Sequence, residues 1–388
     1  MFLMWQSYNA RLKEFKQKRA KETNPEQIKK LDAAIQFLTM KAKHSIHVHK
    51  EGIGIYNAME AAAKNNPTGK AMTKQQDVLG ELTNKQAFEI AKKHFKDYEL
   101  ALMGHDIGRV LEFDKNANTN FKSHPYLSYE MMADQSDISR VATINHNYPT
   151  ADVMYTKMND KGSAGTAACN HGHADWMRSI QLDAYNKYQS MSRDEKVATM
   201  LLSCMVRDAD KLGNWKGVVQ HGDDENSPTM QKIYNLPHGN KDGIKLSERE
   251  MSAVRENRTM KYFEDVTHFI GMALAVLMWA PDFALNVTAK AAAKSDLASG
   301  LINFMDEQGQ DKAVTQNKPA EYAELVKQLE EVFKTKQSRG FISDDKTFDV
   351  NSRLQTLKAM MNGKFTRPKL ALTGTKMYVE PTKNADKV

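Results

Sequence analysis

The sequence predicts an all-α fold. In most long segments the apolar residues recur at every third or fourth position, as they do on the buried face of a helix. Strand-like alternation never extends beyond a few residues, and segments rich in Gly, Pro and Asn separate the periodic stretches. The 388 residues are 41% hydrophobic and 27% charged, which is the composition of an ordinary globular protein.

The first long helix is expected to begin near Pro25, because proline is tolerated in the first turn of a helix. His44 lies on this helix four residues before Val48 and is therefore expected to project from its buried side. A break containing glycine and proline follows at 65–69. The apolar positions that define the buried face step by three or four residues: Ile28, Leu31, Ile35, Leu38, Ala42, Ile46 and Ile53.

The middle of the chain alternates between expected helices and loops. Polar or glycine-rich composition predicts loops at 116–123, 159–170 and 223–243. Periodicity predicts helices over the following ranges: 85–107, 124–132, 138–147, from 174 onward, and 195–212.

The C-terminal part is also expected to be helical. Residues 247–292 are predicted to be helical with a break at Pro281, and 319–336 form an amphipathic helix with glutamates early and lysines late. The apolar run 269–280 is shorter than the roughly 20 residues that a membrane-spanning helix needs, so it predicts a buried core helix. Residues 364–388 are basic, contain two prolines and are expected to fray or remain disordered.

Charge and cysteine content give weaker indications. The net charge of +7 suits a polyanionic substrate but is spread along the chain, which leaves a nucleic-acid surface as an open alternative. Cys169 and Cys204 are too few for a disulfide framework or a cysteine-ligated zinc site, so a cytoplasmic location is expected. The apolar start at Met1 is followed at once by polar and then basic residues, the wrong order for a signal peptide, and no membrane partner is expected.

The most informative motif is the pair His105–Asp106, which follows an apolar stretch and precedes Gly108 and Arg109. Adjacent side chains point about 100° apart on a helix. Both can therefore bind one ion only if the ion lies between the two side-chain directions. His44 upstream and Asp210 downstream supply two further ligand types. A mixed histidine and aspartate set suits Mn, Fe, Co, Ni or Zn better than Mg or Ca.

The order His44, His105–Asp106, Asp210 resembles that of the HD-domain superfamily of metal-dependent phosphohydrolases, and in particular a bacterial subfamily. The resemblance covers about 40–310. It implies an N-terminal helical extension over 1–39 packed on the core, an HD domain over 40–310 with a loop insertion at about 157–178, and a C-terminal helical appendage with a basic flexible tail over 311–388. The blocks that carry it are His105-Asp-Ile-Gly-Arg109, Ser123-His-Pro-Tyr-Leu127, Ile144-Asn-His-Asn147, Arg207-Asp-Ala-Asp-Lys-Leu212 and Trp279-Ala-Pro-Asp282.

The resemblance also implies roles for other residues. His124 and His146 are expected either to complete a second metal site bridged by Asp106, or to line the substrate pocket around a single ion. Arg109 and Lys211 are expected to contact phosphate oxygens, or alternatively to pair with structural carboxylates such as Glu112 or Asp208.

Asp208 itself is expected to orient a ligand histidine. In two places the chain departs from the subfamily pattern: Gly213 stands where an acid is usual, and Ser128 where a glycine is usual. Both departures keep the metal ligands and are expected to alter the pocket lining.

The expected function is hydrolysis of a phosphoester or phosphoanhydride, in a nucleotide or a related small phosphorylated metabolite, by a water that the metal activates. The alternative is a non-catalytic, metal-stabilised HD module that senses a nucleotide or binds a partner. Binding of nucleic acid through the basic termini is a third possibility. The substrate, the number of ions and the oligomeric state stay open at this stage.

Overall fold

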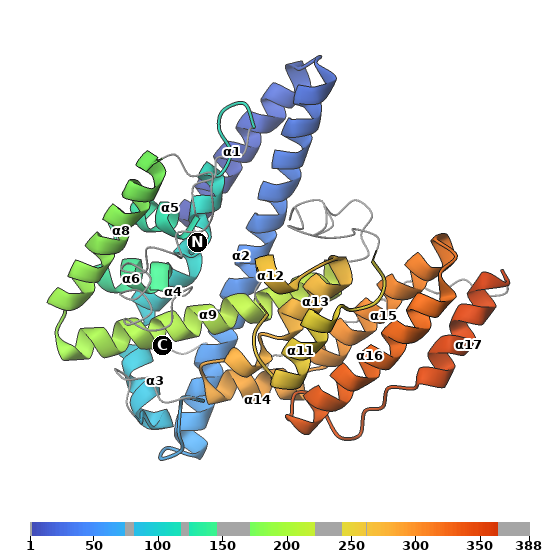
Figure 1. The fold of residues 1–388 in the computed structure, drawn as a ribbon. Helices are drawn as coiled ribbons and strands as arrows, with labels where there is room; N and C mark the ends of the chain where they lie inside the picture. The colour runs from blue at the N-terminus through green and yellow to red at the C-terminus, as the bar shows by residue number, and fades with distance from the viewer. Residues whose placement is uncertain are drawn as a thin grey trace, which may run out of the picture. The chain divides into compact units, whose positions relative to one another are not determined.

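The computed structural model describes residues 2–73, 81–117, 124–145, 171–221, 243–260 and 262–363. In these ranges the regular secondary structure is helical and contains no β-strand, apart from the isolated bridges Lys70–Thr83 and Met72–Leu285 (Figure 1). The prediction of an all-α fold is confirmed. None of the helices in these ranges combines the length and the apolar content that crossing a membrane requires.

The chain folds into two compact units. Unit 1 comprises Met1–Gly213 and Ala284–Val287, and unit 2 comprises Asn214–Phe283 and Thr288–Val388. The region limits suggested by the resemblance, after residues 39 and 310, fall inside the continuous helices α2 (Pro25–Asn65) and α15 (Leu297–Thr315). Neither limit therefore coincides with a break in secondary structure.

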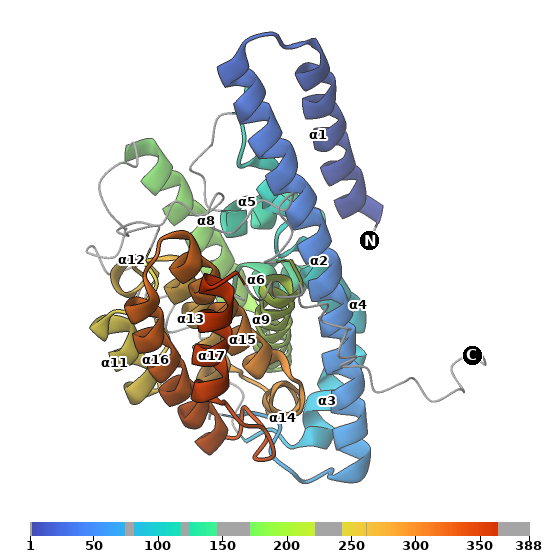
Figure 2. The same ribbon diagram turned by 90° about the vertical axis from the view of Figure 1, so that its right-hand side faces the viewer.

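Unit 1 begins with α1 (Phe2–Lys21), which packs alongside α2 (Figure 2). The side chain of Asn24 accepts hydrogen bonds from the main-chain nitrogens of Glu26 and Gln27, and Pro25 occupies the first helical position, so α2 begins where the sequence predicts. Its buried stripe follows a spacing of three and four residues: Leu31, Ala34, Leu38, Lys41, Ser45, Val48, Gly52, Ile55 and Met59.

The helix expected over 85–107 is two helices followed by a turn. α3 (Asn84–Lys93) starts with a capping box at Thr83 and ends where His94 leaves the helical region, at φ −109° and ψ 28°. α4 (Phe95–Gly104) then ends at His105, and the 3-10 helix η1 (Ile107–Leu111) follows. Asp106 has φ −113° and ψ 7°, so the His-Asp pair lies in a turn rather than within a helix.

The remaining helices of unit 1 appear close to their expected positions. They are α5 (His124–Met131), α6 (Asp137–Asn145), α8 (His171–Ser190) and α9 (Arg193–His221), the last of which continues into unit 2. The loop predicted at 159–170, the loop predicted at 223–243 apart from Gly243, His146 and the tail 364–388 lie outside the described residues.

In unit 2 the segment expected to be helical over 247–292 is divided more often than the sequence suggested. Asn257, at φ 50°, ends α11 (Glu248–Glu256) in the left-handed conformation that often closes a helix. His268 is extended and caps α13 (Phe269–Leu277), in which every residue is buried, as expected for a core helix. The other elements that follow are α12 (Tyr262–Asp265), η2 (Ala280–Asp282), α14 (Asn286–Lys294), α15, α16 (Pro319–Ser338) and α17 (Val350–Met361).

Candidate metal centre

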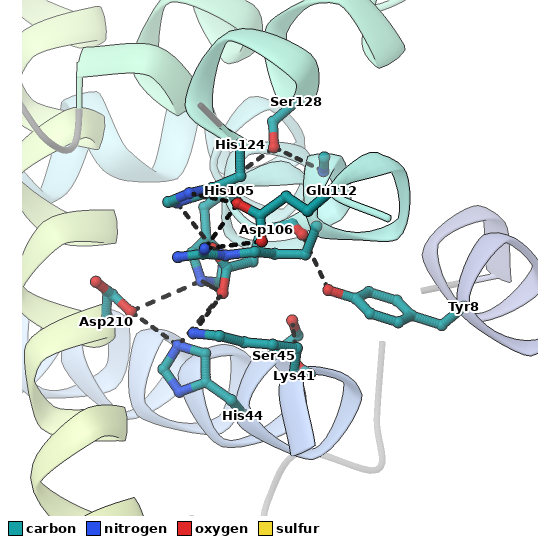
Figure 3. A network of polar contacts seen from close by, with 12 residues as sticks. Tyr8, Lys41, His44, Ser45, His105, Asp106, Glu112, His124, Ser128 and Asp210 are labelled. Carbon is teal, nitrogen blue, oxygen red and sulfur yellow. Dashed lines mark hydrogen bonds and ion pairs between the residues drawn. The ribbon is translucent and has the colours of Figure 1, made fainter. Parts of the chain in front are cut away.

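Three elements of unit 1 bring the predicted metal ligands together (Figure 3). α2 supplies His44, the turn after α4 supplies His105 and Asp106, and α9 supplies Asp210. The ligand atoms of His44, His105 and Asp210 all lie within 4.8 Å of one another. Asp210 Oδ1 is 2.9 Å from His44 Nε2 and 3.8 Å from His105 Nε2.

Asp106 directs one carboxylate oxygen toward the ligand atoms of His44 and His105. Its Oδ2 atom lies 3.7 Å from His44 Nε2 and 3.9 Å from His105 Nε2. This oxygen is buried and accepts no hydrogen bond from the described part of the chain. Ligand atoms bound to one ion at about 2.1 Å are separated by roughly 3.0 to 3.4 Å in octahedral or tetrahedral geometry. The separations around Asp106 and Asp210 are close to that range, so the residues present fit a divalent transition metal.

The ring of His105 is oriented by the backbone. Its Nδ1–H donates to the main-chain oxygen of Leu102 at 2.7 Å, so Nε2 is the ring nitrogen that faces Asp106 and Asp210. Asp208 was expected to orient a ligand histidine, but its two oxygens accept hydrogen bonds from the main-chain nitrogens of Ala284 (2.9 Å) and Leu285 (3.0 Å). Asp208 therefore ties the segment 284–287 to α9.

Both ligand carboxylates are held in the ionised form. Burial raises the pKa of Asp106, but the positive charges of Lys41 and Arg109 outweigh it and hold the pKa well below its usual range. Burial likewise raises the pKa of Asp210, and the hydrogen bond with His44 reverses the shift and lowers the pKa overall. The two carboxylates that face the candidate metal site are thus anionic at neutral pH.

His124 and Arg109 lie on the other side of Asp106. His124 Nε2 is 3.2 Å from Asp106 Oδ1, and its Nδ1 is 3.6 Å from Glu112 Oε1. Burial, together with the charge of Arg109, lowers the pKa of His124 to about 4, so its imidazole is neutral at physiological pH. Arg109 contacts Asp106 Oδ1 through Nε at 3.3 Å and Glu112 through Nη1 at 2.8 Å, the carboxylate pairing that the sequence had left as an alternative.

The second predicted basic residue, Lys211, is buried on α9 directly after Asp210.

Two contacts at Asp106 do not follow from the sequence motifs. The Lys41 ammonium is 3.5 Å from Asp106 Oδ2, and the hydroxyl of Tyr8 donates to the main-chain oxygen of Asp106 at 2.9 Å. A signal for Lys41 was present, because it lies three residues after Leu38 and four before Ser45 on the buried stripe of α2. Tyr8 is 98 residues from its partner and had no such signal.

The two departures from the subfamily pattern have structural explanations. Ser128 Oγ accepts from Gly108 N at 2.9 Å and donates to the main-chain oxygen of His105 at 3.1 Å, so it joins α5 to the His-Asp turn. A Cβ at Gly213 would lie 2.8 Å from Val48 Cγ2, which means that the absence of a side chain lets α9 approach α2 one turn after His44. The expectation was that both residues alter the pocket lining; in the structure Ser128 makes hydrogen bonds within the framework and Gly213 allows close helix packing.

The first two helices also hold the chain after the His-Asp turn. Arg11 donates to the main-chain oxygen of Phe113, and Lys18 to that of Lys115 at 2.7 Å. Gln27, at the start of α2, donates to the main-chain oxygen of Asn116 at 2.6 Å. The N-terminal helix, which lies outside the resemblance, is therefore part of the framework of the site.

Comparison of the chain with protein-family models, with curated proteins and with solved structures gives no match. The geometry of the site and the chemistry of its residues therefore carry the functional argument.

Proposed function

We propose that this protein is a metal-dependent phosphohydrolase of the HD type. The observation that carries the proposal is the convergence of His44 Nε2, His105 Nε2 and Asp210 Oδ1, with the buried oxygen of Asp106 beside them. A scaffold that binds no metal has no physical need for a nitrogen and oxygen donor set of this kind at a single point, and the cationic side chains beside it suit a phosphate substrate.

The donor set suits Mn, Fe, Co, Ni or Zn. Bound there, such an ion supplies a Lewis acid for a phosphoryl oxygen and lowers the pKa of water. Arg109 is held by Glu112 with its guanidinium beside Asp106, so a phosphate oxygen bound next to this carboxylate can pair with it. His124 is neutral and adjacent to Asp106, so it can serve as a ligand of a second ion or accept a proton during the reaction.

The proposed substrate is a phosphoester or phosphoanhydride of a nucleotide or a related small metabolite. A phosphate group is the anion that the cations around Asp106 are suited to bind, and the net charge of +7 favours the approach of such a substrate. Release of a nucleoside monophosphate group, opening of a cyclic nucleotide and cleavage of a pyrophosphate bridge all fit this chemistry.

The proposal is tested by metal content. The purified chain is expected to contain one or two divalent transition ions, by elemental analysis, and Asp210→Asn is expected to lose most of them. Asp194→Asn is the matched control, because Asp194 is exposed at the start of the same helix. A screen of nucleotides and phosphoesters for phosphate release, with the identified metal added, then separates an enzyme from a metal-stabilised binding module.

Two results count against the proposal. Failure of the wild-type chain to take up any of these metals, while its melting curve shows a folded protein, contradicts the metal centre. Metal uptake without hydrolysis of any phosphoester or anhydride supports the non-catalytic alternative.

A further inference from the structure

A buried ammonium lies at the metal-binding side of Asp106. Lys41 is 4% exposed, and its Nζ is 3.5 Å from Asp106 Oδ2. The same oxygen faces His44 Nε2 at 3.7 Å and His105 Nε2 at 3.9 Å (Figure 3). Because Lys41 and His44 are three residues apart on α2, one helix presents a cation and a metal ligand to the same carboxylate.

An ammonium in this place repels a metal ion. Both cations share Asp106 Oδ2 as a neighbour, and burial weakens the screening of their repulsion by water. Lys41 by itself therefore lowers the affinity of the site for a metal. The repulsion is relieved when an anion lies between the two cations, and a phosphate group that contacts both is such an anion.

The charges of the five ionised side chains described above around Asp106 and Asp210, here called the network, favour one ion over two. Asp106, Asp210 and Glu112 supply three negative charges, and Lys41 and Arg109 supply two positive charges. With one divalent ion the network carries a single positive charge, which a phosphate dianion more than neutralises. Two divalent ions would leave three positive charges in a largely buried site, which is costly without further anions.

We propose that Lys41 binds the phosphate group of the substrate beside a single metal ion, and so takes the electrostatic part that a second ion plays in two-metal sites. The inference rests on the proposed function, since it requires a metal ion at His44, His105, Asp106 and Asp210. A lysine suits this role because its ammonium is a compact point charge that attracts phosphate oxygens without a fixed direction.

The test compares Lys41→Met with Lys43→Met in the full chain. Methionine keeps most of the length of the lysine side chain and removes its charge, and Lys43 is an exposed lysine two positions further along the same helix. Two quantities are measured: the affinity and stoichiometry of Mn²⁺ binding by calorimetry, and the affinity of the Mn²⁺-loaded protein for inorganic phosphate by equilibrium dialysis.

The wild-type chain is expected to bind one Mn²⁺. Lys41→Met is expected to bind Mn²⁺ more tightly and phosphate at least about tenfold more weakly, as for the loss of a hydrogen bond between charged groups. Lys43→Met is expected to match the wild type in both measurements. The opposite directions of the two changes distinguish phosphate binding from a structural role, which would weaken both.

Several outcomes overturn the inference. Unchanged phosphate affinity in Lys41→Met, or weaker Mn²⁺ binding in that variant, means that Lys41 only orients Asp106. Two Mn²⁺ ions per wild-type chain remove the argument for a single ion. If Lys41→Met does not fold, Lys41→Gln is measured in its place against the same expectations. Absence of Mn²⁺ binding in the folded wild type contradicts the metal centre itself, and the inference fails with it.

Discussion

Lys336 carries a destabilising charge in unit 2. Its side chain, on α16, is 0% exposed, and Nζ has no hydrogen-bond partner among the described residues. Burial, with a smaller contribution from the charge of Arg339, lowers the pKa of the Lys336 ammonium from 10.5 to about 8. At roughly 1.4 kcal/mol per pKa unit, keeping this ammonium protonated in the folded state costs about 3 kcal/mol.

The sign of the pH dependence follows from the two pKa values. Between about pH 8 and pH 10.5 the unfolded chain keeps the proton and the folded chain releases it. The unfolded state then binds more protons, so the contribution of Lys336 to the free energy of unfolding rises with pH across this window. Below pH 8 both states are protonated, and the full penalty is present.

Lys336→Met is therefore expected to stabilise unit 2 at pH 7 by about 3 kcal/mol. Hydrogen exchange of the α16 amides measures this directly and is expected to slow by roughly a hundredfold. The advantage of the variant over the wild type is expected to shrink as the pH rises from 8 towards 10. Lys334→Met is the control, because Lys334 is exposed on the same helix and pairs only with the surface carboxylate of Glu330 among the contacts described. Faster exchange in Lys336→Met would refute the reasoning, since it would mean that the ammonium is stabilised in solution.

Three further predictions concern unit 1. Tyr8→Phe removes one of the two hydrogen bonds that the main-chain oxygen of Asp106 accepts, the other coming from Arg109 N at 3.0 Å. The change is expected to cost about 1 kcal/mol and to weaken Mn²⁺ binding; unchanged urea unfolding and Mn²⁺ affinity would contradict this. Gly213→Ala places a Cβ 2.8 Å from Val48 Cγ2 and is expected to lower the free energy of unfolding by about 1 to 3 kcal/mol, measured as a lower melting temperature. Gly217→Ala is the control on the same helix, because its Cβ meets open space, and it is expected to be neutral or stabilising. Mn²⁺ at a hundredfold excess over its Kd is expected to raise the free energy of unfolding by about 2.7 kcal/mol, seen as a higher melting temperature that a chelator reverses. An unchanged melting curve would argue against a metal site in the folded state.

The sequence predicted the helices whose ends carry a local signal. Pro25 marked the start of α2, and the unbroken apolar run marked α13. It failed at His94, because apolar residues continue at helical spacing from Ile90 and Ala91 into α4, and nothing in the pattern indicates that the backbone turns there. A periodic pattern reports which face is buried, but not whether the backbone stays continuous.

The convergence of His44, His105 and Asp210 was expected from the resemblance, because spacing along the chain cannot place three elements around a point. The contacts of Asp208 were beyond prediction for a physical reason: its partners are main-chain amides more than 70 residues away, and an amide has the same chemistry in nearly every residue. Lys41 was visible as a charge on a buried stripe, but its role depends on a carboxylate oxygen of Asp106 in the turn after α4.

Main-chain groups are chemically alike in nearly every residue, and this affects which mutations the site tolerates. Tyr8, Arg11, Lys18 and Gln27 all donate to main-chain oxygens in the chain segment that starts at Asp106 and continues to residue 116. Carbonyl oxygens are present whatever the side chain, so the bonds from Lys18 and Gln27 fix the path of residues 115 and 116, whose side chains are exposed, without restricting their identity. Phe113 differs, because its ring also packs against Phe15 and Phe37. In a random library selected for metal binding, substitutions are therefore expected to accumulate at 115 and 116 and to be depleted at Lys18 and Gln27, which position this part of the loop.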